Sequence, residues 1–164
     1  MRLIDSHCHL NYEGLVERQG EVLENARERG VQGFLNISTR QSEWNDVISA
    51  AERNPDVWAT VGVHPHEADA HPDLGAAALV EGTNHPRVIA IKEASGNLEQ
   101  IARITRDRPR DVAVLAGDDA WTLPLLALGG DGVVSVASNE IPGELVALCA
   151  AASAGDWEAA RRTH

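Results

Sequence analysis

The sequence predicts an α/β protein with one parallel sheet of about six strand-and-helix units. Three observations support this fold class. Short apolar runs alternate with helical patterns along the whole chain, and turn residues separate them. The runs are continuously apolar, as in parallel strands that are covered on both faces. Polar side chains collect where each run ends, which is where βα loops build sites.

The first three units have clear boundary signals. Their expected strands cover residues 2–9, 31–38 and 57–63, and their expected helices cover residues 15–29, 42–53 and about 73–80. Gly30 ends the first helix. Ser42 is expected to cap the second helix, which buries one apolar face. The third strand ends at His64.

The last three units are shorter. Their expected strands cover residues 88–91, 112–115 and 133–137. Asn97 is expected to cap the helix that runs to about Asp107, and a short helix after the fifth strand runs through Leu128. Pro142 opens the last helix, which breaks at Gly155.

Composition sets limits on location and partners. A chain of 164 residues is most naturally one domain with a single core. The formal charge of −11 argues against general adhesion to anionic membranes and against a stable nucleic-acid complex. Cys8 and Cys149 give no disulfide framework, and we find neither a signal peptide nor an apolar run of membrane-spanning length. These features predict a cytoplasmic protein.

Lys92 is the single lysine in a chain with thirteen arginines, and it lies at the tip of the fourth strand. A lone lysine there suggests amine chemistry that a guanidinium cannot perform. The alternative is an ordinary solvated lysine. Strand alternation puts Lys92 on one face with Val88 and Ala90, and the opposite face carries Ile89, Ile91 and Glu93. The smaller side chains suit a barrel interior, which favours an inward Lys92, although a bulge would turn Glu93 inward instead.

The first strand carries a His-x-His pattern. Alternation puts Asp5, His7 and His9 on one face, so that both imidazoles could bind one divalent metal ion. The alternative, which we weigh lower, is that the histidines hydrogen-bond to loop carbonyls.

Residues 3–11, 34–39 and 61–68 together resemble the TatD family of metal-dependent hydrolases. The likeness covers about residues 1–91 and implies a TIM-like barrel. It also implies one or two divalent ions (Mg, Mn or Zn) and phosphodiester hydrolysis of the deoxyribonuclease type by a metal-activated water. On this resemblance His7 and His9 are metal ligands, Glu93 is a bridging catalytic glutamate, and His64 lies near the substrate. The family's later histidine ligands and its late catalytic aspartate are missing.

The fifth strand offers a further ligand if Glu93 points away. Asp118 or Asp119, at the end of that strand, would then complete the metal site. Capping the following helix is the commoner role for such a pair.

Residues 91–97, 115–119 and 128–139 resemble dihydrodipicolinate synthase, and this likeness runs from about residue 88 to residue 164. It implies a TIM barrel in which a lysine forms a Schiff base with pyruvate, and Lys92 matches that lysine. The family's catalytic tyrosine and its paired hydroxyl residues are missing. We hypothesise that Ser38 and Thr39, which end the second strand, bind the substrate carboxylate instead.

The chain is therefore expected to be a single hybrid domain over residues 1–164, a TIM-like barrel that is either truncated or re-closed. We predict a metal-dependent hydrolase whose activity is weak, because parts that act as a unit are missing. One alternative is a Schiff-base lyase or aldolase that uses Lys92 on a small-molecule substrate. The other is a non-catalytic scaffold. Six units do not match the eight strands of this barrel, so open edges and a homodimer formed through them are expected.

Overall fold

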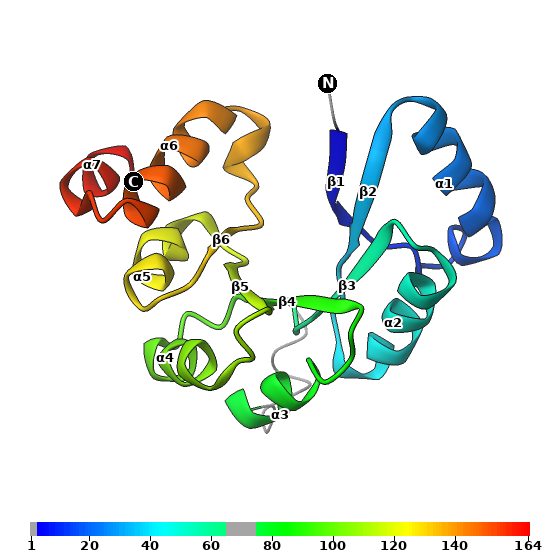
Figure 1. Ribbon diagram of the computed structural model, residues 1–164, viewed down its shortest axis with the longest axis horizontal. Helices are drawn as coiled ribbons and strands as arrows, with labels where there is room; N and C mark the ends of the chain where they lie inside the picture. Colours follow the sequence, from blue (N-terminus) through cyan, green and yellow to red (C-terminus); the bar gives the residue numbers. More distant parts are fainter. Residues whose placement is uncertain (1–2, 65–74) are drawn as a thin grey trace.

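The computed structural model describes residues 3–64 and 75–164 of the chain. Six strands form one sheet, in which each strand lies parallel to its neighbours and the spatial order follows the chain. The strands are β1 (Leu3–Cys8), β2 (Val31–Asn36), β3 (Val57–Val61), β4 (Val88–Glu93), β5 (Ala113–Ala116) and β6 (Gly132–Val133). The sheet curls into a half-barrel (Figure 1). The predicted α/β class and truncated barrel are thus confirmed.

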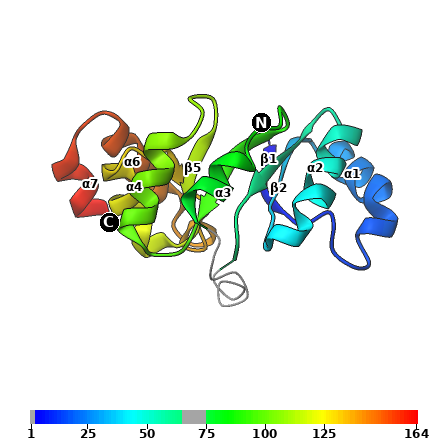
Figure 2. The same ribbon diagram turned by 90° about the horizontal axis from the view of Figure 1, so that it is seen from below.

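The first five helices lie on the convex side of the sheet, and the last two pack beyond the fifth, at the β6 end (Figures 1 and 2). They are α1 (Gln19–Glu28), α2 (Trp44–Arg53), α3 (Ala76–Glu81), α4 (Leu98–Asp107), α5 (Thr122–Ala127), α6 (Pro142–Ser153) and α7 (Trp157–Thr163). The main core lies between this layer and the strands, and its fully buried members include Leu23, Val47, Ile91, Ile101 and Leu125. A second cluster packs α6 and α7 against α5 through Leu126, Leu148, Ala152 and Ala160.

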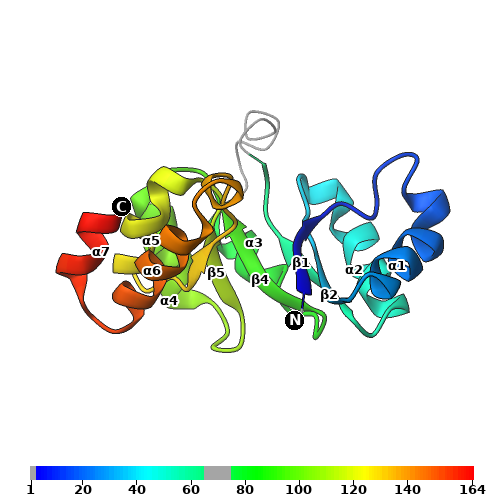
Figure 3. The same cartoon turned by 90° about the horizontal axis from the view of Figure 1, so that it is seen from above.

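The half-barrel does not close within the described ranges, because β1 pairs only with β2 and β6 pairs only with β5. Seen from above, β1 and α6 lie on opposite sides of the opening (Figure 3). Ile4 of β1 is 60% exposed, and Val136 and Val146 on the other side are 77% and 69% exposed. The opening therefore has apolar side chains on both rims.

The register of β4 contains a bulge that the sequence pattern did not predict. Ala59 of β3 pairs with Val88, but the next residue, Thr60, pairs with Ala90, so Ile89 is an extra residue in β4. Val88 and Ile91 consequently both join the helix-facing core, whereas Ile89 is 36% exposed. The expected faces of Val88 and Ile89 were wrong.

Several element boundaries also differ from expectation. Ser42 lies within a 3₁₀ turn (Gln41–Glu43) and does not cap α2, whereas Asn97 caps α4 as predicted. The sixth strand is only two residues long. The carboxylate of Asp119 accepts hydrogen bonds from the backbone N–H groups of Val136 and Ala137, which turns the chain out of the sheet there. Residues 73–74, at the start of the third expected helix, lie outside the described residues.

Candidate active site

Lys92 lies on the concave face of the half-barrel, as strand alternation favoured. It pairs in register with Leu115 of β5, and Leu115 lines a cavity of about 420 Å³ on that face. Because paired residues of adjacent strands point to the same side of a sheet, Lys92 points there as well. Burial lowers the pKa of its ammonium group. A larger fraction of Lys92 is therefore the neutral amine, which is the nucleophilic form.

Glu93 points the other way, into the layer between β4 and α4. Only 3% of its surface is exposed, and its Oε1 accepts hydrogen bonds from the backbone N–H of Ser95 and from the side-chain amide of Gln100, each at 3.2 Å. Glu93 thus anchors the loop after β4 and the first turns of α4. The structure separates it from Lys92, with which it was predicted to share a catalytic site.

His7 and His9 form a hydrogen-bonded pair on the concave side of the sheet. The two Nε2 atoms lie 3.2 Å apart, and Nδ1 of His9 lies 2.9 Å from the carbonyl oxygen of Ile37. Because a carbonyl only accepts, Nδ1 of His9 carries the proton, and the lone pair on its Nε2 accepts a hydrogen bond from His7. The alternative of a loop-carbonyl partner is therefore realised at His9.

Burial and nearby positive charge keep both imidazoles neutral. Burial, followed by the charges of Lys92 and His9, lowers the pKa of His7 to about 4. Burial also lowers the pKa of His9, and Lys92 adds to this effect. The influence of Lys92 on both rings places the three side chains in one electrostatic environment.

Sequence reasoning did not identify Tyr12 as part of this site. Its ring stacks on His9 with centroids 4.6 Å apart and planes 11° apart. Its hydroxyl donates to Thr39 Oγ1 at 3.3 Å, and Thr39 in turn donates to Glu43 at 2.8 Å. The backbone N–H of Tyr12 donates to the carbonyl of His9 and closes a four-residue turn. The available signal in the sequence was the short spacing between the two aromatic rings.

Ser38 and Thr39 lie beside the histidine pair but are buried, with 3% and 5% of their surfaces exposed. The Ser38 hydroxyl donates to the carbonyl of Gly62 at 3.1 Å, so both hydroxyl protons already serve protein acceptors. The backbone N–H of His64 donates to the carbonyl of Thr39 at 2.7 Å, and the charge of His64 contributes to the lowered pKa of His7. Contact of these three residues with a substrate stays a prediction.

Asp118 and Asp119 act as caps. Asp118 Oδ1 accepts a hydrogen bond from the backbone N–H of Ala120 at 2.9 Å, at the start of the 3₁₀ turn Asp119–Trp121. Burial raises the pKa of the Asp119 carboxyl, but hydrogen bonds from Ser135, Ala137 and Val136 outweigh it and lower that pKa overall.

The opening between the two rims holds a second cavity, of about 510 Å³. From one side it is lined by Ile4, Asp5, Ser6, His7 and His9. Because the pairing of β1 with β2 shifts register after Leu3 and after Asp5, a shared face for Asp5, His7 and His9 stays a prediction. From the other side it is lined by Ser135, Ser138 and Asn139, which follow β6. His7 lines both this cavity and the one beside Leu115. A polar pocket next to a half-buried amine is suited to a small carbonyl compound.

Comparison with protein families gives two overlapping matches. Residues 70–164 match the model of the dihydrodipicolinate synthetase family, and residues 4–96 match that of TatD related DNase. The chain belongs to the dihydrodipicolinate synthetase family. The expected resemblance to two families is thereby confirmed, although the curated relatives described next all carry the name of the synthase.

Two curated relatives are named 4-hydroxy-tetrahydrodipicolinate synthase. That of Koribacter versatilis is 50% identical over 92 residues, which is 56% of this chain and 31% of the relative. That of Methanospirillum hungatei is 48% identical over 142 residues, which is 85% of this chain and 49% of the relative. This chain thus spans half or less of the length of these relatives.

Solved structures of dihydrodipicolinate synthases have the same fold. The enzyme from Cyanidioschyzon merolae, crystallised with lysine bound, is 32% identical with a TM-score of 0.70, over 99% of this chain and 55% of that one. The enzyme from Thermotoga maritima is 30% identical with a TM-score of 0.59, over 90% of this chain and 52% of that one. Both match the half-barrel to a little over half of a longer protein.

These findings overturn the prediction of a metal-dependent hydrolase. Relatives up to 50% identical are synthases, and so are the solved structures. The predicted divalent metal is also wrong. Glu93 faces α4 and Asp118 is a cap, so neither carboxylate joins His7 and His9. Within residues 3–64 and 75–164 no group of three His, Cys, Asp or Glu side chains is arranged to hold a metal ion.

Proposed function

We propose that Lys92 forms an imine with a small 2-oxo acid of the pyruvate type, as the first step of a lyase or aldolase reaction. The observation that carries this proposal is the placement of the single lysine on the concave face, half-buried and with a lowered pKa. Imine formation needs a neutral amine, and burial supplies one at neutral pH. The family match over residues 70–164 includes Lys92 and supports the same chemistry.

The absence of a side chain at Gly117 also gives Lys92 room to react. Gly117 follows β5, and a Cβ atom built there would lie 3.0 Å from Cε and 3.3 Å from Cγ of Lys92. The absence of a side chain at position 117 leaves the path of the lysine side chain clear. Leu115, the register neighbour of Lys92, lines a cavity together with His7.

Borohydride trapping tests this proposal directly. The protein is incubated with pyruvate, reduced, digested and examined by mass spectrometry. Lactate, which has a hydroxyl group in place of the ketone, is the matched ligand control. We expect a reduced pyruvate adduct on Lys92. Because Lys92 is the single lysine, the chain's α-amino group is the one other primary amine to distinguish. Lys92→Arg keeps the charge and should abolish the adduct. No adduct on Lys92 in the wild type would leave the alternative of a non-catalytic scaffold.

We also propose that residues 1–164 fold as one hybrid domain joined within β4. The two family matches overlap over residues 70–96, which include β4. β4 pairs with β3 on one side and with β5 on the other, so the junction lies within continuous sheet. A single cooperative unfolding transition followed by two probes is expected, and two separate transitions would contradict the proposal.

For partners, we propose a small-molecule substrate and association of two copies through the open edges. β1 and the segment after β6 present exposed apolar side chains, which favours covering these rims with a second chain. Light scattering should give a dimer, and Ile4→Lys should shift it to monomer; a wild-type monomer would overturn the proposal. In the described part of the chain, no helix has the length and apolarity needed to cross a bilayer.

A further inference from the structure

The hydrogen bonds of the His7–His9 pair do not involve Lys92, and His7 lines the cavity beside Leu115, the register neighbour of Lys92. We propose that His7 carries the proton during imine formation at Lys92, and that His9 is a positioning residue that holds His7 in the required tautomer. This inference rests on the proposed imine site and adds a catalytic residue to it.

The tautomer follows from a directed chain of hydrogen bonds. The Ile37 carbonyl accepts from Nδ1 of His9 at 2.9 Å, which leaves the lone pair of His9 Nε2 to accept from His7. His7 therefore donates through Nε2, at 3.2 Å, and in its neutral form carries no proton on Nδ1. Stacking of Tyr12 on His9 fixes the plane of the second ring. These hydrogen bonds thus leave Nδ1 of neutral His7 unprotonated, with a lone pair that can accept a proton.

One cavity on the concave side links His7 to the strand next to Lys92. His7 lines the cavity of about 420 Å³ together with Leu115, and Leu115 is the register neighbour of Lys92. After burial, the charge of Lys92 contributes to the lowered pKa of both His7 and His9. A cavity of this size accommodates a three-carbon 2-oxo acid.

Other ionisable groups near Lys92 are engaged elsewhere. Glu93 faces α4, where Ser95 and Gln100 donate to it, and Asp118 caps a 3₁₀ turn. The hydroxyl of Tyr12 donates to Thr39. Asp5 Oδ1 accepts from the backbone N–H of His7 at 3.0 Å, which ties it to the strand. Of these described side chains, His7 is the one that lines the cavity and whose Nδ1 takes no part in the His7–His9 hydrogen bond.

The proton transfers balance in two steps. The neutral amine of Lys92 attacks the ketone carbon, the C–N bond forms, and the carbonyl π electrons move to the oxygen. His7 Nδ1 takes a proton from the new ammonium centre, and the resulting imidazolium returns it to the oxygen. After this oxygen has acquired two protons in total, one from each N–H of the former amine, water leaves and the C=N bond forms. Amine and ketone thus yield imine and water, and His7 ends as it began.

The test compares the rate of pyruvate trapping on Lys92 in four proteins: the wild type, His7→Gln, His9→Gln and His85→Gln. Glutamine keeps hydrogen-bonding capacity, but its amide neither gains nor loses a proton near neutral pH, so general acid–base catalysis is lost. We expect His7→Gln to slow trapping by about a hundredfold or more, while the final extent of trapping stays the same. His9→Gln should slow it by a smaller factor. His85, which bonds Glu52 at the opposite end of the sheet, is the matched control and should leave the rate unchanged.

Chemical rescue separates catalysis from structure. In His7→Ala, added imidazole should restore a concentration-dependent part of the trapping rate, whereas a purely structural role for His7 would give no rescue. An unchanged trapping rate in His7→Gln, or the absence of rescue in a folded His7→Ala, overturns the role of His7. Both outcomes leave the imine site intact. Failure of the wild type itself to trap pyruvate would instead refute the proposed function.

Discussion

Lys92 lies so close to Gly117 that a Cβ atom at position 117 would be 3.0 Å from its Cε and 2.7 Å from the Cβ of Ala94. The first contact involves a flexible side chain that can move, whereas the second involves a Cβ atom that is fixed to the backbone. The backbone N–H of Gly117 also donates to the carbonyl of Glu93 at 2.7 Å, which holds the two strand ends together. The course of the lysine side chain therefore depends on the residue opposite it.

Gly117→Ala is expected to displace Lys92 and to strain the ends of β4 and β5. Overpacking of this kind costs about 1–3 kcal/mol in the free energy of unfolding. We also expect slower trapping of pyruvate on Lys92.

Gly20→Ala is the matched control, because position 20 lies in α1 with no heavy atom within 4 Å of the added Cβ. It should be neutral or stabilising by up to about 1 kcal/mol. Urea denaturation and the trapping assay measure both effects, and equal behaviour of the two variants would contradict the prediction.

Asn97→Ala tests the cap that aligns α4 with the end of β4. Oδ1 of Asn97 accepts hydrogen bonds from the backbone N–H groups of Glu99 and Gln100, at 3.0 and 3.1 Å. Loss of such a cap costs about 1 kcal/mol of stability, while Asn97→Asp should retain most of it. Chemical denaturation distinguishes the variants. If Asn97→Asp lost as much stability as Asn97→Ala, the capping interaction would not be the cause.

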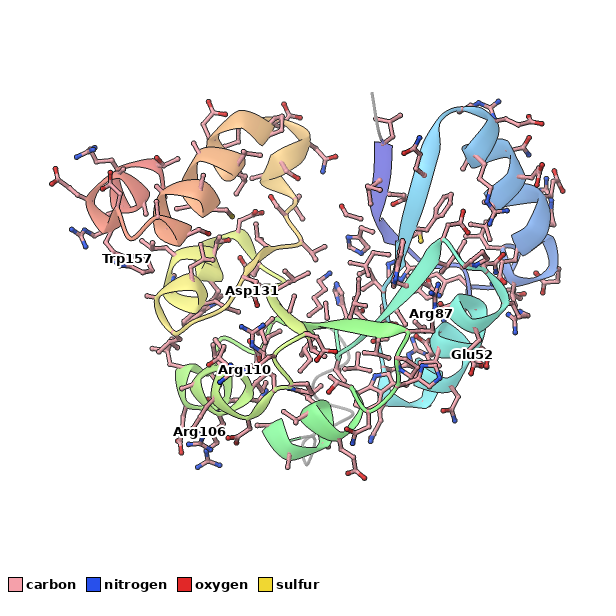
Figure 4. All side chains as sticks on the ribbon, in the orientation of Figure 1. Glu52, Arg87, Arg106, Arg110, Asp131 and Trp157 are labelled. Carbon is pink, nitrogen blue, oxygen red and sulfur yellow. The ribbon has the colours of Figure 1, made fainter. Side chains whose placement is uncertain are left out.

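Arg87→Lys tests the contact that joins β4 to the end of α2, which Figure 4 shows around the labelled Arg87. Its guanidinium donates to the carbonyls of Ala51, Asn54 and Pro55 at 2.8–3.1 Å and also to that of Val57. It lies over the ring of Trp58, 5.5 Å from the centroid. An ammonium group cannot span these acceptors, so we expect a loss of about 1.5–3 kcal/mol.

The control for this substitution is Arg103→Lys on the exposed side of α4. Arg103 contacts Glu99 one turn earlier, and both side chains are more than half exposed. Exposed pairs contribute little, so the change in the free energy of unfolding should stay within about 0.5 kcal/mol. A similar loss in both variants would show that a generic arginine effect, rather than the carbonyl contacts, is responsible.

Local rules were sufficient to predict much of the fold and part of the site. Alternation along β4 placed Lys92 on the concave face, in register with Leu115. Asn97 was recognised as a cap because its role depends only on the residues that immediately follow it. These predictions need no knowledge of distant partners.

The features that were missed depend on partners elsewhere in the chain. The bulge at Ile89 is set by pairing with β3, and the short sixth strand follows from contacts of Asp119 with the segment after it. Glu93 was assigned to a metal site from its motif, yet its position is determined by Gln100 on the next helix. A motif names residue types, but whether they converge depends on how the whole sheet is assembled.

The ion pair Arg27–Asp56 gives a pH-dependent prediction. Both guanidinium nitrogens that contact Asp56 lie 2.7 Å from its carboxylate oxygens, and these hydrogen bonds hold the pKa of the carboxyl below its usual value of 3.8. Because the folded pKa lies below the unfolded one, the pair stabilises the protein above about pH 4, and this contribution is lost as the pH falls through the folded pKa.

A double-mutant cycle with Arg27→Met and Asp56→Asn should give a coupling of up to about 1 kcal/mol near neutral pH, since the side chains are partly exposed. The coupling should shrink as the solution is acidified below about pH 4. A coupling that stays constant down to the lowest pH at which the protein remains folded would show that packing, rather than charge, joins α1 to the start of β3.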